Sequence, residues 1–556
     1  MDCINNNSCI DDRLSSKPEQ SQTEPPSSTY AGREVIERDK NEFSLLLDLP
    51  EDIQSRIFTY LQARDIAHLT RANSSINNRL KNDDAMARAC YRQLASSHQT
   101  LLKTIVATKD KDELRKWLQR FTKDEALIKS IMDRQASIHF PALFFSTLTK
   151  LMCQCKAFKL ETKASIPCSS SKDLAAFSAD GRHLVIACDS KIFKIYGRES
   201  DGTWQAKGTI CHDSAVESIT FSADDRYVVT TSRKCKTKIY GKKDERSWEE
   251  ATISRDNSLY SAKISADGCH VLNRSTNNKV KIYGLEAGGS WEEKATLCHN
   301  DWVRSATFSP DSCHVVTCSE DCKTKIYGLE ADGSWKEKAS KYHGYSIRSA
   351  TFSPDSRRMM TCTCDGRVKI YGQKDDGSWK RQATTSNDDQ FNSATFSPDS
   401  RHLITSCFPG KAKIYSQKDD VSWKQKKTIS HYLEIRSTAF SVDSRHVMTC
   451  SYDRKVKING LKDDGSWQEK TAISHGLGIR SAVFSFDGRH VVTASDEKTS
   501  EIYGQVSDGS WQKKATISHG CRIRSAIFSA DGHVLTIHTD NTAKITELKM
   551  DGWMGG

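Results

Sequence analysis

The sequence lacks the features that mark membrane proteins and nucleic-acid-binding proteins. No stretch of its 556 residues stays apolar for long enough to form a secretory signal or to cross a bilayer. Lys and Arg outnumber Asp and Glu by 82 to 71, but the basic residues are spread along the chain and form no dense block. We therefore expect a cytoplasmic, intracellular protein that binds neither a membrane nor nucleic acid.

Motifs for catalysis and for cofactors are also missing. The chain contains no Gly-rich phosphate loop and no Gly-x-Ser-x-Gly elbow. The pairs Cys153-x-Cys155 and Cys362-x-Cys364 are weak metal signals, because neither has a matching second pair. The 19 cysteines are scattered, which is typical of free thiols in a reducing compartment. We expect no enzyme activity, no cofactor and no metal site.

The chain does contain one stretch of about 44 residues, repeated in nine copies. A Phe-Ser-x-Asp core anchors each copy, at Phe177, Phe221, Phe308, Phe352, Phe396, Phe440, Phe484 and Phe528, with Ile264 in the Phe position once. A Trp follows each anchor, at Trp204, Trp248, Trp291, Trp335, Trp379, Trp423, Trp467, Trp511 and Trp553. A fixed period of this length is typical of a propeller or an array.

Each copy reads as four short strands. In one copy, alternation from Ile347 ends at the turn 354–356, a second run ends at Asp365-Gly366, a third ends at Gly372, and Trp379 opens a fourth. Four strands separated by polar turns describe one antiparallel propeller blade, and a single blade needs neighbours to cover its apolar faces. The sequence thus predicts a mainly β fold, a propeller of eight or nine blades, whose weakest units are those at Ile264 and Phe396.

The two ends of the repeat region are expected to meet in one blade. Residues 158–167 look like the fourth run of a copy, whereas the ninth copy ends before a fourth strand could form. The first strand can therefore supply the outer strand of the last blade. This closure would remove an exposed sheet edge, which is an aggregation liability.

The copies resemble WD repeats. The Gly-His pair of that family corresponds to a His nine residues before the anchor, at His212, His299, His343, His431, His475 and His519. The turn Asp before the third strand corresponds to Asp321, Asp365, Asp453 and Asp540, and Tyr-Gly replaces the Trp-Asp pair. Because the His recurs, we interpret it as structural, hydrogen-bonded to a strand hydroxyl within its blade.

Residues 42–92 form a second informative stretch. Pro50 and the acids after it suit the first turn of a helix, and apolar residues follow at helical spacing. The pattern resembles an F-box, a module that docks a Skp-type adaptor of a cullin-RING ubiquitin ligase. The resemblance implies that the adaptor-binding residues are Leu49, Pro50, Ile53, Ile57, Phe58, Leu61, Ile66 and Leu69. The alternative is a helical hairpin that packs on its own neighbours.

The remaining segments are less specific. Residues 1–41 are polar and lack apolar periodicity, so we expect a disordered tail. Residues 93–157 are expected to form a helical linker, either a spacer between adaptor and propeller or a layer packed beneath the propeller. The propeller itself is expected over 158–556.

An Arg stands four residues before the anchor in five copies, at the start of the innermost strand. Symmetry would place these side chains around the mouth of the central channel on one face. In F-box proteins with WD repeats, an Arg at this point looks like the residue that grips a phosphorylated degron, and Arg233 falls at another such position. The resemblance thus implies client-binding residues Arg233, Arg304, Arg348, Arg436, Arg480 and Arg524. Arg suits phosphate or carboxylate because of its planar fork of donors.

The alternative for these residues is that duplication copied one Arg whose head lies in water or pairs with an acid. For the whole chain, the sequence favours a non-catalytic substrate receptor of an SCF-type ubiquitin ligase, with an acidic or phosphorylated client. A scaffold without a ubiquitin role and an enzyme built on a propeller are the rival classes. The source stays open between a eukaryote and a bacterium that lives within one, where the protein would act in the host cytosol.

Overall fold

The computed structural model describes residues 85–551, apart from 93, 95, 169–173, 200, 233–235, 244–247, 255–258, 276–277, 387–390, 419–421 and 507. The predicted tail at 1–41 and residues 42–84 of the predicted F-box lie outside the described residues. The chain divides into two compact units, Met1–Ala85 and Met86–Gly556, and the second holds the repeats. Within the described residues, no helix has the length and apolar character needed to span a membrane.

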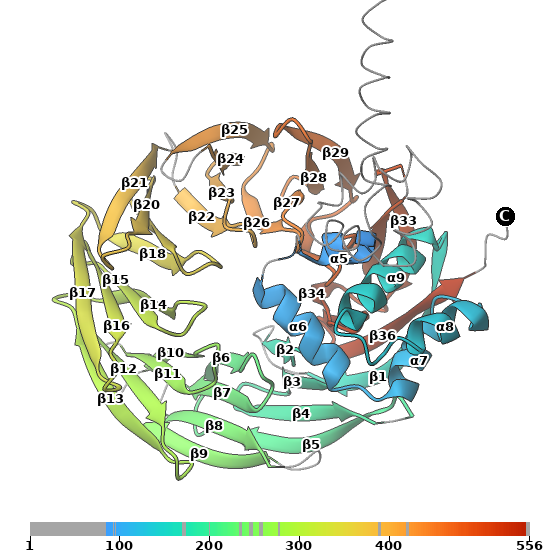
Figure 1. Cartoon of the computed structure of the whole chain (residues 1–556), viewed down its shortest axis with the longest axis horizontal. Helices are drawn as coiled ribbons and strands as arrows, with labels where there is room; N and C mark the ends of the chain where they lie inside the picture. Colours follow the sequence, from blue (N-terminus) through green and yellow to red (C-terminus); the bar gives the residue numbers. More distant parts are fainter. Residues whose placement is uncertain are drawn as a thin grey trace, which may run out of the picture. The chain divides into compact units, whose positions relative to one another are not determined.

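Nine four-stranded antiparallel sheets form a ring, so the repeat region is a nine-bladed β-propeller (Figure 1). Blade 1 consists of β2 (Ala175–Phe177), β3 (His183–Ala187), β4 (Ile192–Arg198) and β5 (Trp204–Cys211). Blade 2 consists of β6 (Val216–Phe221), β7 (Tyr227–Ser232), β8 (Lys236–Lys242) and β9 (Trp248–Ser254). Blade 3 consists of β10 (Leu259–Ile264), β11 (His270–Ser275), β12 (Lys279–Leu285) and β13 (Trp291–Cys298). Blade 4 consists of β14 (Val303–Phe308), β15 (His314–Ser319), β16 (Lys323–Leu329) and β17 (Trp335–Tyr342). Blade 5 consists of β18 (Ile347–Phe352), β19 (Arg358–Thr363), β20 (Arg367–Gln373) and β21 (Trp379–Ser386). Blade 6 consists of β22 (Phe391–Phe396), β23 (His402–Cys407), β24 (Lys411–Gln417) and β25 (Trp423–Ser430). Blade 7 consists of β26 (Ile435–Phe440), β27 (His446–Ser451), β28 (Lys455–Leu461) and β29 (Trp467–Ser474). Blade 8 consists of β30 (Ile479–Phe484), β31 (His490–Ser495), β32 (Thr499–Gln505) and β33 (Trp511–Ser518). Blade 9 consists of β34 (Ile523–Phe528), β35 (His533–His538), β36 (Thr542–Asp551) and β1 (Ala157–Pro167).

The ring closes as the sequence predicts. β1 pairs antiparallel with β36, from Ala157 opposite Asp551 to Pro167 opposite Thr542. The first strand of the repeat region is therefore the outer strand of blade 9, and the closing blade joins both ends of the propeller. The weak copies at Ile264 and Phe396 also form complete four-stranded blades, so the blade number is nine.

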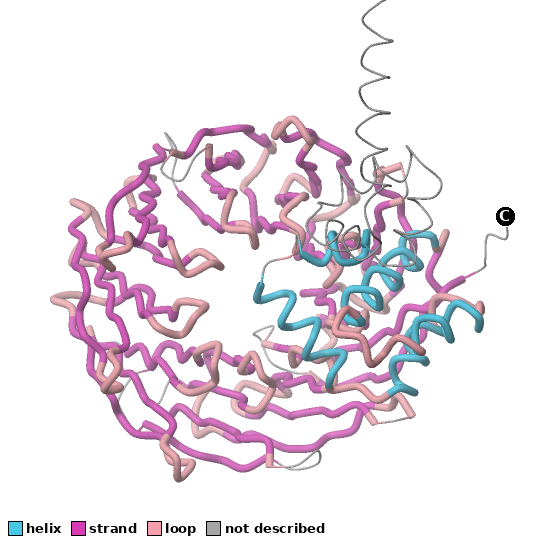
Figure 2. The backbone as a smooth tube through the Cα atoms, in the orientation of Figure 1, coloured by secondary structure: helices cyan, strands magenta, loops and turns pink. Residues whose placement is uncertain are grey.

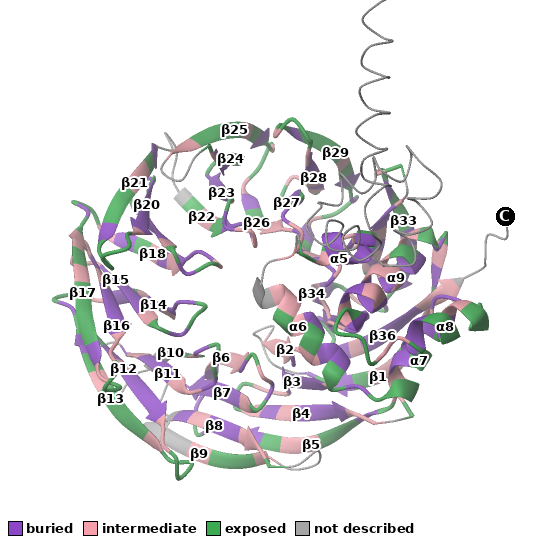
Figure 3. Ribbon diagram, viewed as in Figure 1, coloured by how far each residue is buried: buried purple, intermediate pink, exposed green. Residues whose placement is uncertain are grey.

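Burial within a blade follows its layers. The second strand is almost wholly buried, as in β27, because its two sides pack against the neighbouring blades, whereas outer strands such as β17 are mostly exposed and bury only Trp335 at their start. Figure 3 shows this change from buried inner strands to exposed outer strands. The repeated Trp connects blades: the ring of Trp335 meets Phe308 of its own blade at 6.0 Å and His270 of the preceding blade edge-on at 5.5 Å.

Helices pack against blades 8, 9 and 1, as Figure 2 shows on one side of the ring. They are α5 (Ala85–Arg92), α6 (Ser96–Ala107), α7 (Lys111–Gln119), α8 (Glu125–Met132) and α9 (Phe140–Gln154). A capping box of Asp110 and Glu113 starts α7. Trp117 of this helix packs between Phe144 of α9 and Phe486 of blade 8, at ring distances of 5.4 and 6.1 Å. The predicted linker is thus packed against the propeller.

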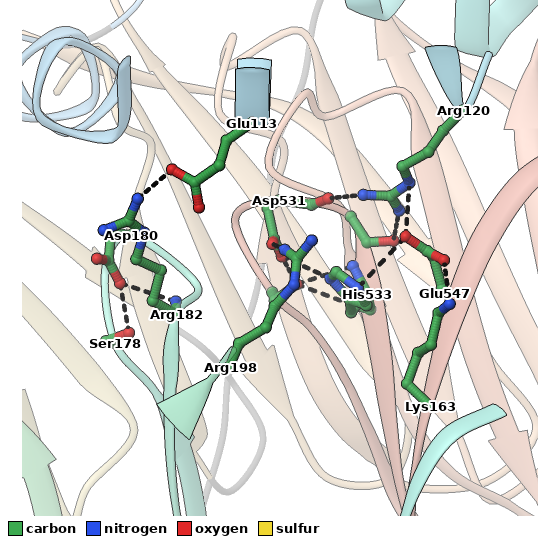
Figure 4. Close-up of polar contacts among 12 residues, drawn as sticks. Glu113, Arg120, Lys163, Ser178, Asp180, Arg182, Arg198, Asp531, His533 and Glu547 are labelled. Atoms are coloured by element: carbon green, nitrogen blue, oxygen red, sulfur yellow. Dashed lines mark hydrogen bonds and ion pairs between the residues drawn. The ribbon is translucent and has the colours of Figure 1, made fainter. Parts of the chain in front are cut away.

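Arg120, directly after α7, fixes the helices to the closing blade. The guanidinium donates from Nη1 to the carbonyl of Asp531 at 2.9 Å and from Nε to the carbonyl of Leu548 at 3.2 Å. It also forms an ion pair with Glu547 at 3.3 Å, and both side chains are only 7% exposed. Arg198 of blade 1 reaches the carboxylate of Asp531 at 2.5 Å, so one buried network joins helix, blade 9 and blade 1 (Figure 4).

Candidate functional site

The two faces of the ring differ in which connections they carry. In an antiparallel meander, successive connections alternate between the two ends of the strands. The turns between first and second strands therefore lie on one face of the ring. The turns between second and third strands lie on the other face, together with the loops that lead from one blade to the next. We name the first the helix face, because its turns carry Phe486 and Asp531, which contact the helices.

The inner strands of blades 2 to 9 each begin with a β-bulge beside the second face, which we name the bulge face. In blade 4, Val303 pairs with Ser319 and Ser305 pairs with Cys318, so Arg304 has no partner in the ladder. The same position is held by Glu217, Tyr260, Arg348, Asn392, Arg436, Arg480 and Arg524 in the other blades. Because a bulge re-aims its side chain, the five predicted Arg residues share one local geometry on one face.

Arg304 and Arg480 are each paired with an acid. Arg304 forms an ion pair with Glu320, and its guanidinium stacks on Trp302 with a centroid distance of 4.3 Å. Arg480 donates from Nε to Asp496 at 2.9 Å. Both acids lie in the turn between the second and third strands of the same blade, sixteen residues after the Arg. For these two positions, the structure shows the acid-paired arrangement that was the alternative to anion binding.

Arg436 has a different surrounding. Among the described residues, its side chain meets an aromatic group and no carboxylate: Nη1 donates to the hydroxyl of Tyr452 at 3.2 Å, and the guanidinium lies 5.5 Å from the ring. Tyr452 occupies the turn position at which Glu320 and Asp496 stand in blades 4 and 8. The positive charge of Arg436 is therefore exposed and not neutralised by its own blade.

The other predicted residues fall into two groups. Arg348 is exposed in blade 5 and Arg524 is half-buried in blade 9, at the same bulge position. In blade 6 an Asn replaces the Arg, and Asn392 donates to the carbonyl of Ile435 at 2.9 Å. Arg233 lies outside the described residues, as do Leu49, Pro50, Ile53, Ile57, Phe58, Leu61, Ile66 and Leu69.

Exposed apolar side chains gather on the bulge face of blades 5 to 8. They come from the loops before β18, β26 and β30 and from the second-to-third-strand turns of blades 6 and 7, and they are Tyr345, Phe408, Tyr432, Leu433, Tyr452 and Leu477. Tyr432 is 87% exposed. Large exposed apolar groups on one face mark interaction sites, and Arg beside aromatic groups is the composition found at protein interfaces.

The repeated histidines are structural, as predicted, in five of the six copies. His299 is typical: Nε2 lies 2.7 Å from the Thr317 hydroxyl and Nδ1 lies 3.0 Å from Asp321. Burial lowers the pKa of His299, His343 and His431, to about 4 for His343, so these three rings are neutral near pH 7. The prediction is wrong for His519, because neither of its ring nitrogens has a hydrogen-bond partner among the described residues.

Three features of this face were missed in the sequence. The bulge depends on strand register, which spacing alone does not reveal. The acids that pair with Arg304 and Arg480 stand sixteen residues later in the same copies. An acid at this offset distinguishes those two copies from the copy that carries Arg436. The exposed apolar residues lie in loops where the copies differ most, so the repeat pattern gave no signal for them.

The comparison with protein-family profiles agrees with the repeat fold. The profile of the WD domain, G-beta repeat, matches residues 204–240, 291–328, 336–372, 423–458 and 467–503, and no F-box family is matched. No curated protein matches the chain. The crystal structure of Saccharomyces cerevisiae Sqt1 is similar with a TM-score of 0.47 and 11% sequence identity, over 61% of this chain and 97% of that one. The chain is therefore a nine-bladed β-propeller, five segments of which match the WD domain, G-beta repeat.

Proposed function

We propose that this protein is the substrate-receptor subunit of an SCF-type ubiquitin ligase. Its F-box-like segment docks a Skp-type adaptor, and the bulge face of its propeller captures an acidic or phosphorylated client. The protein makes no covalent bond itself. It raises the effective concentration of the client near the charged ubiquitin-conjugating enzyme. WD40 propellers are generally protein-interaction scaffolds, and this proposal gives the scaffold a specific pair of partners.

The observation that supports client capture is the exposed guanidinium of Arg436 within a face rich in exposed apolar groups. Its charge lacks a carboxylate among the described residues, while its contact with Tyr452 holds the planar fork in place. A phosphate or carboxylate can accept two parallel hydrogen bonds from such a fork. The neighbouring Tyr432 and Leu433 offer apolar contact to the residues that flank the anion. Arg348 in blade 5 adds a second exposed cation, and Asn392 stands at the equivalent position of the next blade.

A peptide array tests client capture. The full chain is probed on phosphorylated, acidic and neutral peptides, as wild type and as Arg348→Glu/Arg436→Glu. The matched control is Arg357→Glu/Arg401→Glu, which makes the same charge change at exposed positions on the helix face of blades 5 and 6. The proposal expects the first variant to lose binding to charged peptides at least tenfold, and the control to bind as wild type does. Equal binding by all three proteins would remove the bulge face as the client site.

A pull-down with purified Skp-type adaptor tests the other half of the proposal. Wild type is compared with Leu49→Ala/Pro50→Ala/Ile53→Ala, and Glu51→Ala/Gln54→Ala/Ser55→Ala serves as the control at polar positions of the same stretch. Retention of wild type and control, with loss of the apolar variant, supports the ligase role. If the wild type itself is not retained, the protein is a scaffold without a ubiquitin role, and the exposed apolar groups of the bulge face serve other partners.

A further inference from the structure

Blade 9 departs from the other copies at two positions that lie close together on the bulge face. The last residue of its second strand is His538, which faces Ile523 across the ladder, whereas Ser319, Ser451 and Ser495 hold the equivalent place. Two residues after its repeated His stands Cys521. The other copies with this His have Ser214, Asp301, Tyr345, Leu433 and Leu477 there.

The substitution at 538 changes what the repeated His can do. In the other blades the His reaches the strand Thr, as His299 reaches Thr317. In blade 9, His538 takes that hydroxyl instead: its Nε2 lies 2.9 Å from Thr536 Oγ1. His519 is left 8% exposed, with both ring nitrogens unpartnered among the described residues. Its ring centroid lies only 4.4 Å from that of His538.

A thiol and a carboxylate complete the group. One ligand atom from each of Cys521, His538 and Asp540 can be chosen so that all three lie within 4.8 Å of one another. A tetrahedral zinc ion with ligand bonds of about 2.0 to 2.3 Å needs ligand atoms roughly 3.5 Å apart, so modest side-chain rotation suffices. Cys, His and Asp are the usual zinc ligands, whereas scattered acidic clusters bind calcium or magnesium.

The surroundings of His538 suit a ligand. Nε2 hydrogen-bonds with Thr536 Oγ1 and so orients the ring, and a metal ion bound at Nδ1 replaces the hydrogen bond of that nitrogen with Thr542 Oγ1. Nδ1 lies 3.0 Å from Thr542 Oγ1, and the same hydroxyl lies 2.6 Å from Asp540 Oδ1, so this nitrogen is on the side of the carboxylate. Ligating histidines in proteins are commonly oriented in this way through their second nitrogen.

We propose that Cys521, His538 and Asp540 bind a zinc-class transition-metal ion, with His519 as the fourth ligand. The ion joins the loop before β34 to the turn between β35 and β36. Since β36 also pairs with β1, the site strengthens the blade that closes the ring. Its role is structural, and it is independent of client or adaptor binding.

The test uses Zn²⁺ and Co²⁺ alone with the full chain, purified with a non-thiol reductant and freed of metal with a chelator. The variants are Cys521→Ser and His538→Ser, and the second restores the residue of Ser319 and its equivalents, so its fold is supported by the sister blades. Cys313→Ser, an exposed thiol in a helix-face turn of blade 4, controls for binding to the many other cysteines. Unfolding of the metal-free proteins is measured to verify that all four are folded.

We expect wild type and Cys313→Ser to bind one equivalent of Co²⁺ with a thiolate charge-transfer band that Zn²⁺ removes. Both should melt at a higher temperature with Zn²⁺ present. Cys521→Ser and His538→Ser should lose at least tenfold in affinity, together with the metal-dependent rise in melting temperature. The proposal is overturned if wild type gives no thiolate band, or if His538→Ser binds and is stabilised as wild type is.

Discussion

The helix face and the bulge face of this propeller use the same residue types in opposite ways. On the helix face, Arg120 is buried and every part of its guanidinium is engaged by carbonyls and by Glu547. On the bulge face, Arg436 is exposed, and its guanidinium hydrogen-bonds with the hydroxyl of Tyr452 and lies against the ring of that residue. A buried, satisfied cation contributes to the folded state, whereas an exposed one is available for a partner. The difference supports the proposal that the helix face maintains the fold and that the bulge face binds the client.

The largest expected effect comes from removing the aromatic contact between helices and blades. Trp117 is 4% exposed and packs on Phe144, Phe145 and Phe486. Trp117→Ala should lower the free energy of unfolding by about 3 to 5 kcal/mol, because it leaves a cavity in that cluster. Denaturant unfolding measures the loss. Tyr432→Ala on the bulge face is the control and should change stability by less than about 0.5 kcal/mol; equal losses in both variants would erase the distinction between the faces.

Acid should destabilise the propeller through its buried histidines. The pKa of His343 is lowered to about 4 by burial, then by Lys369, and burial also lowers the pKa of His299 and His431. A group whose folded pKa lies below its unfolded value stabilises the fold above the unfolded pKa and loses that contribution as pH falls toward the folded one. The melting temperature should therefore fall between about pH 6.5 and pH 4.

Carboxylates with a lowered pKa, such as Asp311, lose their charge below this interval, whereas burial and the neighbouring Asp180 raise the pKa of Asp225 to about 7, and that group opposes the histidines. Burial raises the pKa of Asp311, but the nearby His314 ring and the hydrogen bond from the Ser309 hydroxyl outweigh burial and lower this pKa to about 2, so its contribution is lost only below about pH 4. A melting temperature that stays constant from pH 6.5 to pH 4, and falls only below that interval, would contradict the account of the histidines.

The smallest expected effect on stability is that of charge reversal on the bulge face. Arg348→Glu/Arg436→Glu should change the free energy of unfolding by less than about 0.5 kcal/mol per residue, because both side chains are exposed at their bulges. Denaturant midpoints of wild type and variant compare directly. A loss of several kcal/mol would mean that these cations maintain the fold, and the comparison of faces would have to be abandoned.

Local patterns in the sequence were sufficient for the blades, because the same turns and strands recur in every copy. The closure by residues 157–167 and the bond of His299 to Thr317 follow from that recurrence. Features that depend on contacts between distant residues were not visible in this way. The bulge beneath Arg436 depends on register, and the helices were left as either a spacer or a packed layer because their contact with Phe486 crosses more than 300 residues. Blade 9 was treated as one more copy, so the change at His538 was not weighed.

One measurement tests the contrast between the faces most directly: melting temperature and affinity for an acidic or phosphorylated peptide, determined on Arg120→Ala and Arg436→Glu beside wild type. The peptide is one that binds wild type on the array. The account predicts that Arg120→Ala melts at a clearly lower temperature and, while folded, binds the peptide as wild type does, since it loses only the buried contacts to Asp531, Leu548 and Glu547. Arg436→Glu should melt as wild type does and lose peptide binding at least tenfold. If Arg436→Glu keeps its affinity, or loses stability as Arg120→Ala does, the bulge face is not the binding face of this propeller.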